Sequence, residues 1–150
     1  MAQSLAKILL HVVFSTKNRE PRIPPSLQPR LHAYLAEACR SVGSQAYRVG
    51  GTEDHVHIAC SLPRTMAPSD LVLGIKTASS AWMKGQDDGC VQFAWQGGYG
   101  AFSLGQSQLP GLLHYIGNQQ EHHRTRLFRD EILEILKRDE VQHHEEHLWD

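Results

Sequence analysis

Hydrophobic and polar residues alternate along this chain with two different periods, and each change of period marks a boundary between predicted elements. Over residues 7–15 and 55–62 the period is two residues, which predicts β-strands whose successive side chains point to opposite faces. Another strand is expected at 45–49, because a pair of glycines joins it to the strand that follows. Residues 91–104 are apolar and aromatic but interrupted by glycines, which predicts a bent or bulged strand.

Apolar residues spaced three and four positions apart predict helices in the intervening segments. Ser26 is expected to cap the first helix, which runs to about Arg40 and ends at Gly43. A later helix begins near Pro110 and is expected to continue to Arg124. The end of the chain is polar, so it is expected to fray. The remaining predicted helices cover residues 68–84 and 130–140.

The predicted order of strand, helix, strand, strand, helix and strand is that of a split βαβ motif. It indicates an α+β fold, a ferredoxin-like (RRM-like) sandwich with a four-stranded antiparallel sheet, helices on one face and further C-terminal helices. The opposite face of the sheet is then expected to be free for a ligand or a second subunit. A length of 150 residues suits one domain, which we assign to 1–140, followed by a polar, histidine-rich tail at 141–150.

The overall charge is close to neutral, with 15 Lys and Arg residues against 16 Asp and Glu residues. This balance excludes a strongly basic coat protein for nucleic acid and a polyacidic disordered chain. Along the sequence, however, residues 1–30 hold five basic residues and one acidic residue, whereas residues 107–150 hold five basic and nine acidic residues. The chain therefore has a basic first segment and an acidic last segment.

Cysteine usage and hydropathy indicate a cellular compartment. Three cysteines without CxxC spacing argue against a zinc ribbon or a disulfide framework and favour a reducing environment. The apolar run at residues 8–10 is broken by His11 and no small-residue cleavage site follows, so a secretory signal is not expected. No stretch approaches the roughly 18 apolar residues of a membrane span. These features predict a cytoplasmic protein without membrane attachment.

The sequence contains ten histidines, a number that suggests metal, proton-transfer or phosphate chemistry, although scattered surface histidines would give the same count. His55 and His57 lie two residues apart on a predicted strand, so both imidazoles leave the same face, about 7 Å apart at Cα. Two imidazoles at this spacing can converge on one divalent ion and leave room for a third ligand and for substrate oxygens. The alternative is a chance H-x-H on a solvated strand.

A second candidate pair lies on the predicted helix that begins near Pro110. Tyr115 and Gln119 are four residues apart and would project side by side, with Ile116 in the buried stripe. The phenol could act as a nucleophile, and the amide could offer a carbonyl oxygen to a hard metal. The alternative is an amphipathic core tyrosine beside a surface amide.

The ordered set of these motifs resembles the small single-tyrosine HUH transposases of the insertion-sequence-200/605 type, together with their relatives associated with repetitive extragenic palindromes (REPs). The resemblance covers about residues 8–136, and each motif is weak alone. Gly117 departs from the family pattern, in which a larger residue is common, and costs a helix about 1 kcal/mol relative to alanine. In chain order the motifs are residues 11–19 (HVVFSTKNR), 54–58 (DHVHI), 95–103 (WQGGYGAFS), 115–119 (YIGNQ) and 121–123 (EHH).

This resemblance implies a transposase that cleaves and rejoins single-stranded DNA at hairpin-bearing element ends. Tyr115 would attack a phosphodiester to give a 5′-phosphotyrosine and a free 3′-hydroxyl. His55, His57 and Gln119 would hold one Mg²⁺ or Mn²⁺ against the scissile phosphate. The resemblance further implies a homodimer in which the tyrosine helix of one subunit can serve the histidine pair of the other.

Basic residues near the proposed site are candidates for contacts with the DNA backbone. Lys17, Arg19 and Arg22 lie in the segment after the first strand, and Arg48 lies on the strand before the histidine pair. The alternative is a solvated basic loop. The acidic C-terminal region is expected to face away from DNA, and its histidines read as part of a solvated tail rather than a metal site.

Two other functions remain to be weighed. A histidine-triad nucleotide hydrolase would need a third alternating histidine at position 59, which is Ala59. A domesticated, non-catalytic protein that binds DNA hairpins on the same fold is the stronger alternative. The presence of Tyr115, His55, His57 and Gln119 argues against such decay without proving activity.

Overall fold

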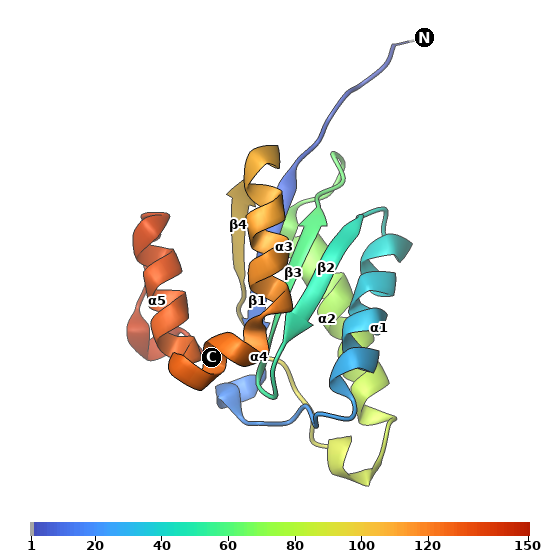
Figure 1. Ribbon diagram of the computed structural model, residues 1–150. Helices are drawn as coiled ribbons and strands as arrows, with labels where there is room; N and C mark the ends of the chain where they lie inside the picture. The colour runs from blue at the N-terminus through green and yellow to red at the C-terminus, as the bar shows by residue number, and fades with distance from the viewer. Residues whose placement is uncertain (1) are drawn as a thin grey trace.

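The computed structural model describes residues 2–150, except for the side chains of residues 124 and 125. It contains a four-stranded antiparallel sheet with the strand order β2-β3-β1-β4 (Figure 1). This is the order of the split βαβ motif, so the predicted ferredoxin-like fold is confirmed. The strands are β1 (Leu9–Ser15), β2 (Ala46–Gly51), β3 (His55–Ser61) and β4 (Gly100–Leu104).

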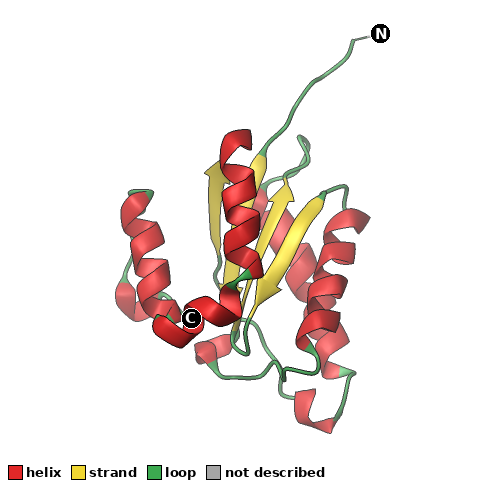
Figure 2. Cartoon of the chain, in the orientation of Figure 1, coloured by secondary structure: helices red, strands yellow, loops and turns green. Residues whose placement is uncertain are grey.

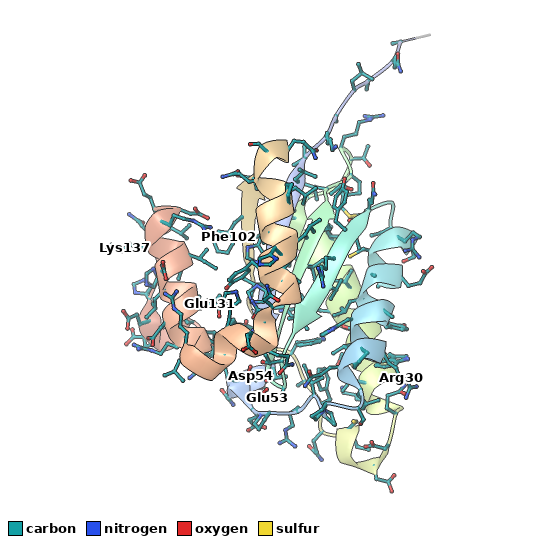
Figure 3. The ribbon with its side chains drawn as sticks, in the orientation of Figure 1. Arg30, Glu53, Asp54, Phe102, Glu131 and Lys137 are labelled. Atoms are coloured by element: carbon teal, nitrogen blue, oxygen red, sulfur yellow. The ribbon has the colours of Figure 1, made fainter. Side chains whose placement is uncertain are left out.

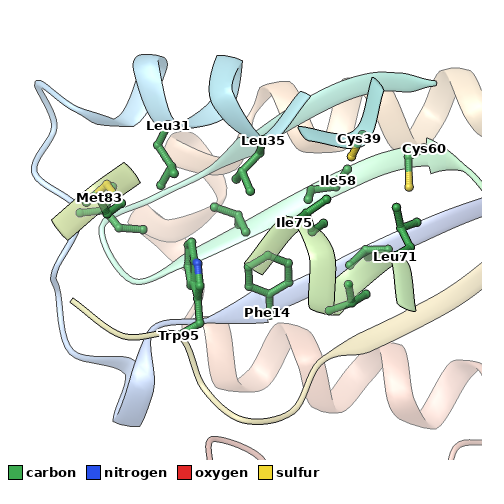
Figure 4. Packing of buried hydrophobic residues seen from close by; sticks show 14 of the residues in the cluster. Phe14, Leu31, Leu35, Cys39, Ile58, Cys60, Leu71, Ile75, Met83 and Trp95 are labelled. Carbon is green, nitrogen blue, oxygen red and sulfur yellow. The ribbon is translucent and has the colours of Figure 1, made fainter. Parts of the chain in front are cut away.

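One face of the sheet is covered by α1 (Gln28–Ser41) and α2 (Pro68–Lys84), and the main hydrophobic core lies between these layers (Figure 4). Alternation along the strands supplies the sheet side of this core, since every second residue of β1 and β3 points into it. Trp95 extends the core beyond the strand ends: its ring packs against Phe14 at 4.7 Å between centroids, and its indole nitrogen donates to Ser79. The strand residues in this core are Leu10, Val12, Phe14, Val56, Ile58 and Cys60.

The opposite face of the sheet is not free, contrary to the expectation from the sequence. Helices α3 (Leu109–Gly117), α4 (Gln119–Thr125) and α5 (Phe128–Arg138) lie on this side, as the distribution of helices in Figure 2 shows. Apolar residues of α3 and α5 pack on the second face of β1, β3 and β4, because that face also carries apolar side chains. The buried residues of this layer are Leu9, Val13, Ala59, Phe102, Leu109, Ile116, Phe128, Ile132, Ile135 and Leu136.

A glycine on β2 sets how closely α3 approaches the sheet. A Cβ added at Gly50 would lie 2.6 Å from the backbone oxygen of Ile116 and 2.8 Å from its Cγ2. These contacts are shorter than real Cβ contacts, so only glycine allows α3 to pack against β2 at this distance.

The structure corrects several predicted boundaries. The fourth strand covers only residues 100–104, because the segment before it is irregular and touches the sheet through a bridge between Trp95 and Thr16. The N-cap of α1 is Leu27 rather than Ser26. The helix expected to reach Arg124 is interrupted at Asn118, where α3 ends and α4 begins. Short 3-10 turns lie at Lys17–Arg19 (η1), Asp88–Cys90 (η2), Gln106–Gln108 (η3) and Glu145–His147 (η4).

The end of the chain packs on the domain rather than fraying. The backbone amides of Gly97 and Gly98 donate to the backbone oxygen of Asp150, and the Gln96 side chain donates to the carbonyl of Leu148. The guanidinium of Arg19 lies 4.5 Å from the centre of the Trp149 ring. The basic first segment and the acidic last segment are therefore in contact.

Two further findings concern the cysteines and the lengths of the helices. All three cysteines are free and buried, as expected from their spacing. Across residues 2–150, no helix has the length and apolar character needed to cross a bilayer.

Candidate active site

The register of β3 places His55 and His57 on the sheet face that α3, α4 and α5 cover. Val56 between them points into the main core, so the two imidazoles lie on one face, 5.1 Å apart between ring centroids. Both side chains have no solvent exposure. The prediction of a shared face is confirmed, and the alternative of a solvated strand is wrong.

Each imidazole is oriented by a partner at its Nδ1 atom. Nδ1 of His55 lies 2.8 Å from Oδ1 of Asp54 and 3.0 Å from Oγ1 of Thr52. Nδ1 of His57 lies 2.8 Å from Nε2 of His11, which is itself buried on β1. With Nδ1 occupied in both rings, the Nε2 atoms remain for the site, which is the arrangement found when histidines bind metals.

Gln119 meets this pair at the first position of α4. Its Oε1 atom lies 2.9 Å from Nε2 of His55. Because Nδ1 of His55 also faces the Asp54 carboxylate, both ring nitrogens of His55 face oxygen acceptors, whereas a neutral imidazole carries only one N–H. Nε2 of His57 is buried and has no hydrogen-bond partner among the described residues. The unpartnered Nε2 atom of His57 and the two oxygen acceptors around His55 suit a cation between the rings.

Burial controls the charge state of several groups at the site. It lowers the pKa of His57 well below the ordinary value, with further lowering from His55 and His11, so this imidazole is neutral and able to bind a metal. Burial also lowers the pKa of His11 to about 4. Burial alone would raise the pKa of Asp54, but the hydrogen bonds to His55 and Thr52 and the charges of His55 and His123 together outweigh it, and the pKa falls below the usual range. Asp54 is therefore an ionised partner for His55.

Tyr115 reaches the histidine pair from α3. Its ring stands edge-on to His57 at 5.5 Å between centroids, and to His11 at 6.4 Å. The hydroxyl is buried and makes no hydrogen bond within the described part of the chain. The tyrosine also lines a cavity of about 380 Å³ between α3 and α5, whose other walls include His11, Arg126 and Arg138. The carboxylates of Glu131, Glu134 and Asp139 line the same space, and Arg126 and Arg138 pair with Glu134 and Asp139 respectively.

The relation between Tyr115 and Gln119 differs from the prediction. They were expected as i, i+4 neighbours on one helix, but the backbone leaves helical geometry at Asn118 (φ −106°, ψ 21°). Tyr115 therefore belongs to α3 and Gln119 to α4. Gly117, the last residue of α3, disfavours continuation of the helix. Both residues still reach the histidine pair.

Phe128 and Glu131, which the sequence analysis did not single out, and His123, which belongs to the motif at 121–123, complete the surroundings. Phe128 stacks on His55 at 3.8 Å between ring centroids, which holds the start of α5 on the site. His123 lies 3.1 Å from Oε1 of Gln119 and 2.9 Å from Oε2 of Glu131. Burial lowers the pKa of His123 to about 4, with a further contribution from His55, and raises the pKa of Glu131 to about 7 against an opposing effect of His55.

A signal for Glu131 was present in the sequence. Glu131 lies three residues after Phe128 and one before Ile132, within the apolar stripe of α5. The sequence therefore has a carboxylate at a position where the periodicity predicts a buried side chain. His123 belongs to the motif at 121–123, whose role was left open, and Phe128 carried no comparable signal.

The structure does not gather the predicted DNA contacts at the cavity. Arg19 lies over Trp149, and Arg22 pairs with Glu20. Arg48 donates to the backbone oxygen of Leu113 on α3 and covers Gly117, where an added Cβ would lie 2.4 Å from the guanidinium carbon. Lys17 belongs to the turn η1. None of these four basic side chains lines the cavity at the tyrosine.

The metal ligands remain a prediction. Over the described residues, no three His, Cys, Asp or Glu side chains already form a group able to hold a metal ion. An amide such as that of Gln119 is not one of these residue types. The fold brings the predicted donors together, and binding would require them to adjust.

Comparison with known proteins identifies a family that matches this chain. Residues 4–119 match the family described as transposase IS200 like, which is more than half of the chain. No curated protein matches the sequence.

Two solved structures share the fold. A presumed transposase from Deinococcus radiodurans R1 superposes with a TM-score of 0.61 at 19% identity, covering 79% of this chain and 98% of its own. A REP-associated tyrosine transposase bound to a REP hairpin superposes with a TM-score of 0.60 at 13% identity, covering 82% of this chain and 73% of its own. The region matched by the family contains His55, His57, Tyr115 and Gln119.

Proposed function

Since this chain belongs to the family of IS200-like transposases, we propose that it cleaves and rejoins single-stranded DNA through a covalent bond to Tyr115. The observation that carries the proposal is the contact between Tyr115 and His57, 5.5 Å between ring centroids, within one chain. A nucleophile beside buried imidazoles that face a glutamine amide is what a tyrosine-dependent transfer at phosphate requires.

The proposed reaction conserves the energy of the phosphodiester. The Tyr115 oxygen attacks the phosphorus, the bond to the 3′-oxygen breaks, and a 5′-phosphotyrosine and a free 3′-hydroxyl result. The phenol loses one proton and the leaving 3′-oxygen gains one, so protons balance. A 3′-hydroxyl of another strand can then attack the phosphotyrosine and release Tyr115, and no nucleotide triphosphate is consumed. The buried hydroxyl of Tyr115 must reach the phosphate through the cavity that it lines.

We assign Nε2 of His55, Nε2 of His57 and Oε1 of Gln119 as the atoms that would hold one Mg²⁺ or Mn²⁺. The unpartnered Nε2 of His57 and the two oxygen acceptors around His55 support this assignment. A bound divalent cation polarises the phosphoryl oxygen and stabilises charge in the transition state. Asp54 and His11 hold the two rings in the orientation that this role needs.

We further propose hairpin-bearing single-stranded DNA as the substrate, because a REP-associated tyrosine transposase of similar fold is bound to a REP hairpin. Lys17, Arg19, Arg22 and Arg48 are proposed to contact its backbone, as basic groups outside the cavity, of which Arg19 is half-buried and the others are exposed. Tyr115 and His57 of the same chain are adjacent, which supports a complete site within one subunit. From the family resemblance we also propose a homodimer in which the tyrosine helix of one subunit can serve the histidine pair of the other.

The test is formation of a covalent adduct. The full chain is incubated with Mg²⁺ or Mn²⁺ and labelled single-stranded DNA that carries an element-end hairpin. We expect a protein–DNA adduct that disappears in Tyr115→Phe, and loss of the adduct with retained binding in His55→Ala. Tight hairpin binding without an adduct in the unsubstituted chain would instead support a non-catalytic hairpin-binding protein.

A further inference from the structure

A carboxylate reaches the histidine pair from α5 and has no role in the reaction as described so far. Glu131 is 4% exposed and lies between α5 and α3 (Figure 3). Its Oε1 atom lies 3.8 Å from Nε2 of His57 and accepts a hydrogen bond of 3.3 Å from Nε2 of Gln119. Glu131 therefore contacts two of the three groups to which we assign the cation.

We propose that Glu131 is a further ligand of the divalent cation and supplies its one negatively charged oxygen. The inference rests on the proposed function, because it assumes that the cation binds at the histidine pair. The resulting site would contain two imidazoles, one amide oxygen and one carboxylate, drawn from β3, α4 and α5.

Charge is the first argument for this role. Two neutral imidazoles and an amide bring no negative charge to a divalent ion, and His55 and His57 are fully buried. Burying an uncompensated charge is costly, and Mg²⁺ and Mn²⁺ prefer oxygen ligands, carboxylates above all. Asp54 faces the far side of His55, at Nδ1, so its carboxylate acts through the ring. Glu131 presents a carboxylate to the Nε2 side.

Distance is the second argument. A separation of 3.8 Å between Oε1 of Glu131 and Nε2 of His57 is too long for a hydrogen bond. Two atoms that bind one metal ion at about 2.0–2.2 Å lie about 3–4 Å apart. The Nε2 atom of His57, which has no hydrogen-bond partner among the described residues, thus faces a carboxylate oxygen at a ligand-to-ligand distance.

Apolar contacts hold the helix that carries Glu131, whose Oε2 atom also lies 2.9 Å from Nε2 of His123. Phe128 stacks on His55, and Ile132, Ile135 and Leu136 pack against Val13 and Phe102. These apolar contacts hold α5 on the sheet, so an uncharged side chain of the same shape can be tested at position 131 without removing the helix.

The experiment measures cation binding without DNA or turnover. The full chain is titrated with Mn²⁺ by isothermal calorimetry, and the same titration is made with Glu131→Gln, with His57→Ala and with Asp130→Asn. Asp130 is the matched control, because it is the preceding acidic residue of α5 and its side chain is 53% exposed. We expect Glu131→Gln to weaken Mn²⁺ binding by at least the 10–100-fold typical of changes around metal ligands, and Asp130→Asn to leave it unchanged.

Each other outcome has a defined meaning. Unchanged Mn²⁺ affinity in Glu131→Gln, with binding lost in His57→Ala, overturns the role of Glu131 and leaves the cation site intact. Absence of Mn²⁺ binding in the unsubstituted chain overturns the inference as well. If Glu131→Gln does not fold, Glu131→Met removes the carboxylate on an uncharged side chain of similar length, and affinity equal to that of the unsubstituted chain would again count against the role. A Tyr115 adduct in the DNA assay reports on the proposed function independently of these titrations.

Discussion

His11 on β1 and His57 on β3 are joined by a hydrogen bond of 2.8 Å between Nε2 of the first ring and Nδ1 of the second. The two rings are stacked with centroids 5.1 Å apart, and both are buried. If His57 uses Nε2 for a cation, its Nδ1 carries the proton and donates to His11, whose lone pair then fixes the orientation of the His57 ring.

We expect His11→Ala to weaken Mn²⁺ binding by about 10–100-fold, because the His57 ring loses its acceptor. His11→Gln, which offers a carbonyl oxygen, should restore part of the affinity, a recovery that a purely space-filling role would not produce. Calorimetric titration measures both, with exposed His143→Ala as the control. Wild-type affinity in His11→Ala would show that His57 is oriented without His11.

The structure also yields a prediction about the approach of α3 to the sheet. Gly50→Ala is expected to destabilise the protein by about 1–3 kcal/mol, because the new methyl group would lie 2.6 Å from the backbone oxygen of Ile116. Gly74 is a matched control, since it lies inside α2 with open space around it, and Gly74→Ala should stabilise the protein by about 0.5–1 kcal/mol. Urea unfolding distinguishes them; equal effects in the two variants would contradict the close approach.

Much of the fold and part of the site could be predicted because they depend on local periodicity. The alternation in residues 55–62 placed His55 and His57 on one face, and the order of elements indicated the sheet topology. The break at Asn118 was not predictable in this way, because the apolar spacing carries no stop signal there. Across the break, Ile116 of α3 packs with Leu9 and Ala59 of the sheet, and Gln119 of α4 contacts His55.

Long-range contacts account for the remaining differences. The stripe of α5 predicted that one face is buried, but it could not show that Phe128 and Glu131 meet the histidine pair. The tail was expected to fray from its polar composition. Backbone amides at Gly97 and Gly98 hold its last residue instead, and composition does not record such contacts.

Stability is expected to fall in acid because histidines are buried in neutral form. Burial, with a smaller effect of His55, lowers the pKa of His32 from 6.5 to about 4. Between these two values His32 binds a proton in the unfolded chain but not in the folded chain. Its effect on the free energy of unfolding is therefore absent above pH 6.5 and destabilises the fold increasingly as the pH falls toward 4. The buried carboxyl of Glu131 acts in the opposite direction, since its pKa is raised to about 7 and its ionisation destabilises the fold as the pH rises from 4.5.

Comparing variants isolates the contribution of His32 to this pH dependence. The free energy of unfolding of the unsubstituted chain and of His32→Gln is measured at pH 7.5 and pH 5. His32→Gln should lose about 1–2 kcal/mol less than the unsubstituted chain between these pH values, because its side chain does not titrate. His143→Gln should behave like the unsubstituted chain. Identical pH dependence in His32→Gln would show that protonation of His32 costs the fold nothing.

The basic first segment predicts a salt-dependent contribution to DNA binding. Arg19→Glu is expected to weaken hairpin binding and to make the dependence of log K on log salt shallower by about one unit, the effect of losing one phosphate contact. Arg64→Glu reverses an exposed charge in the loop between β3 and α2 and should leave that slope unchanged. Because Arg19 lies over Trp149, Trp149→Ala serves as a second control that disturbs the tail without removing the charge. Equal weakening in Trp149→Ala, with no change of slope in Arg19→Glu, would assign the effect to the tail instead of a phosphate contact.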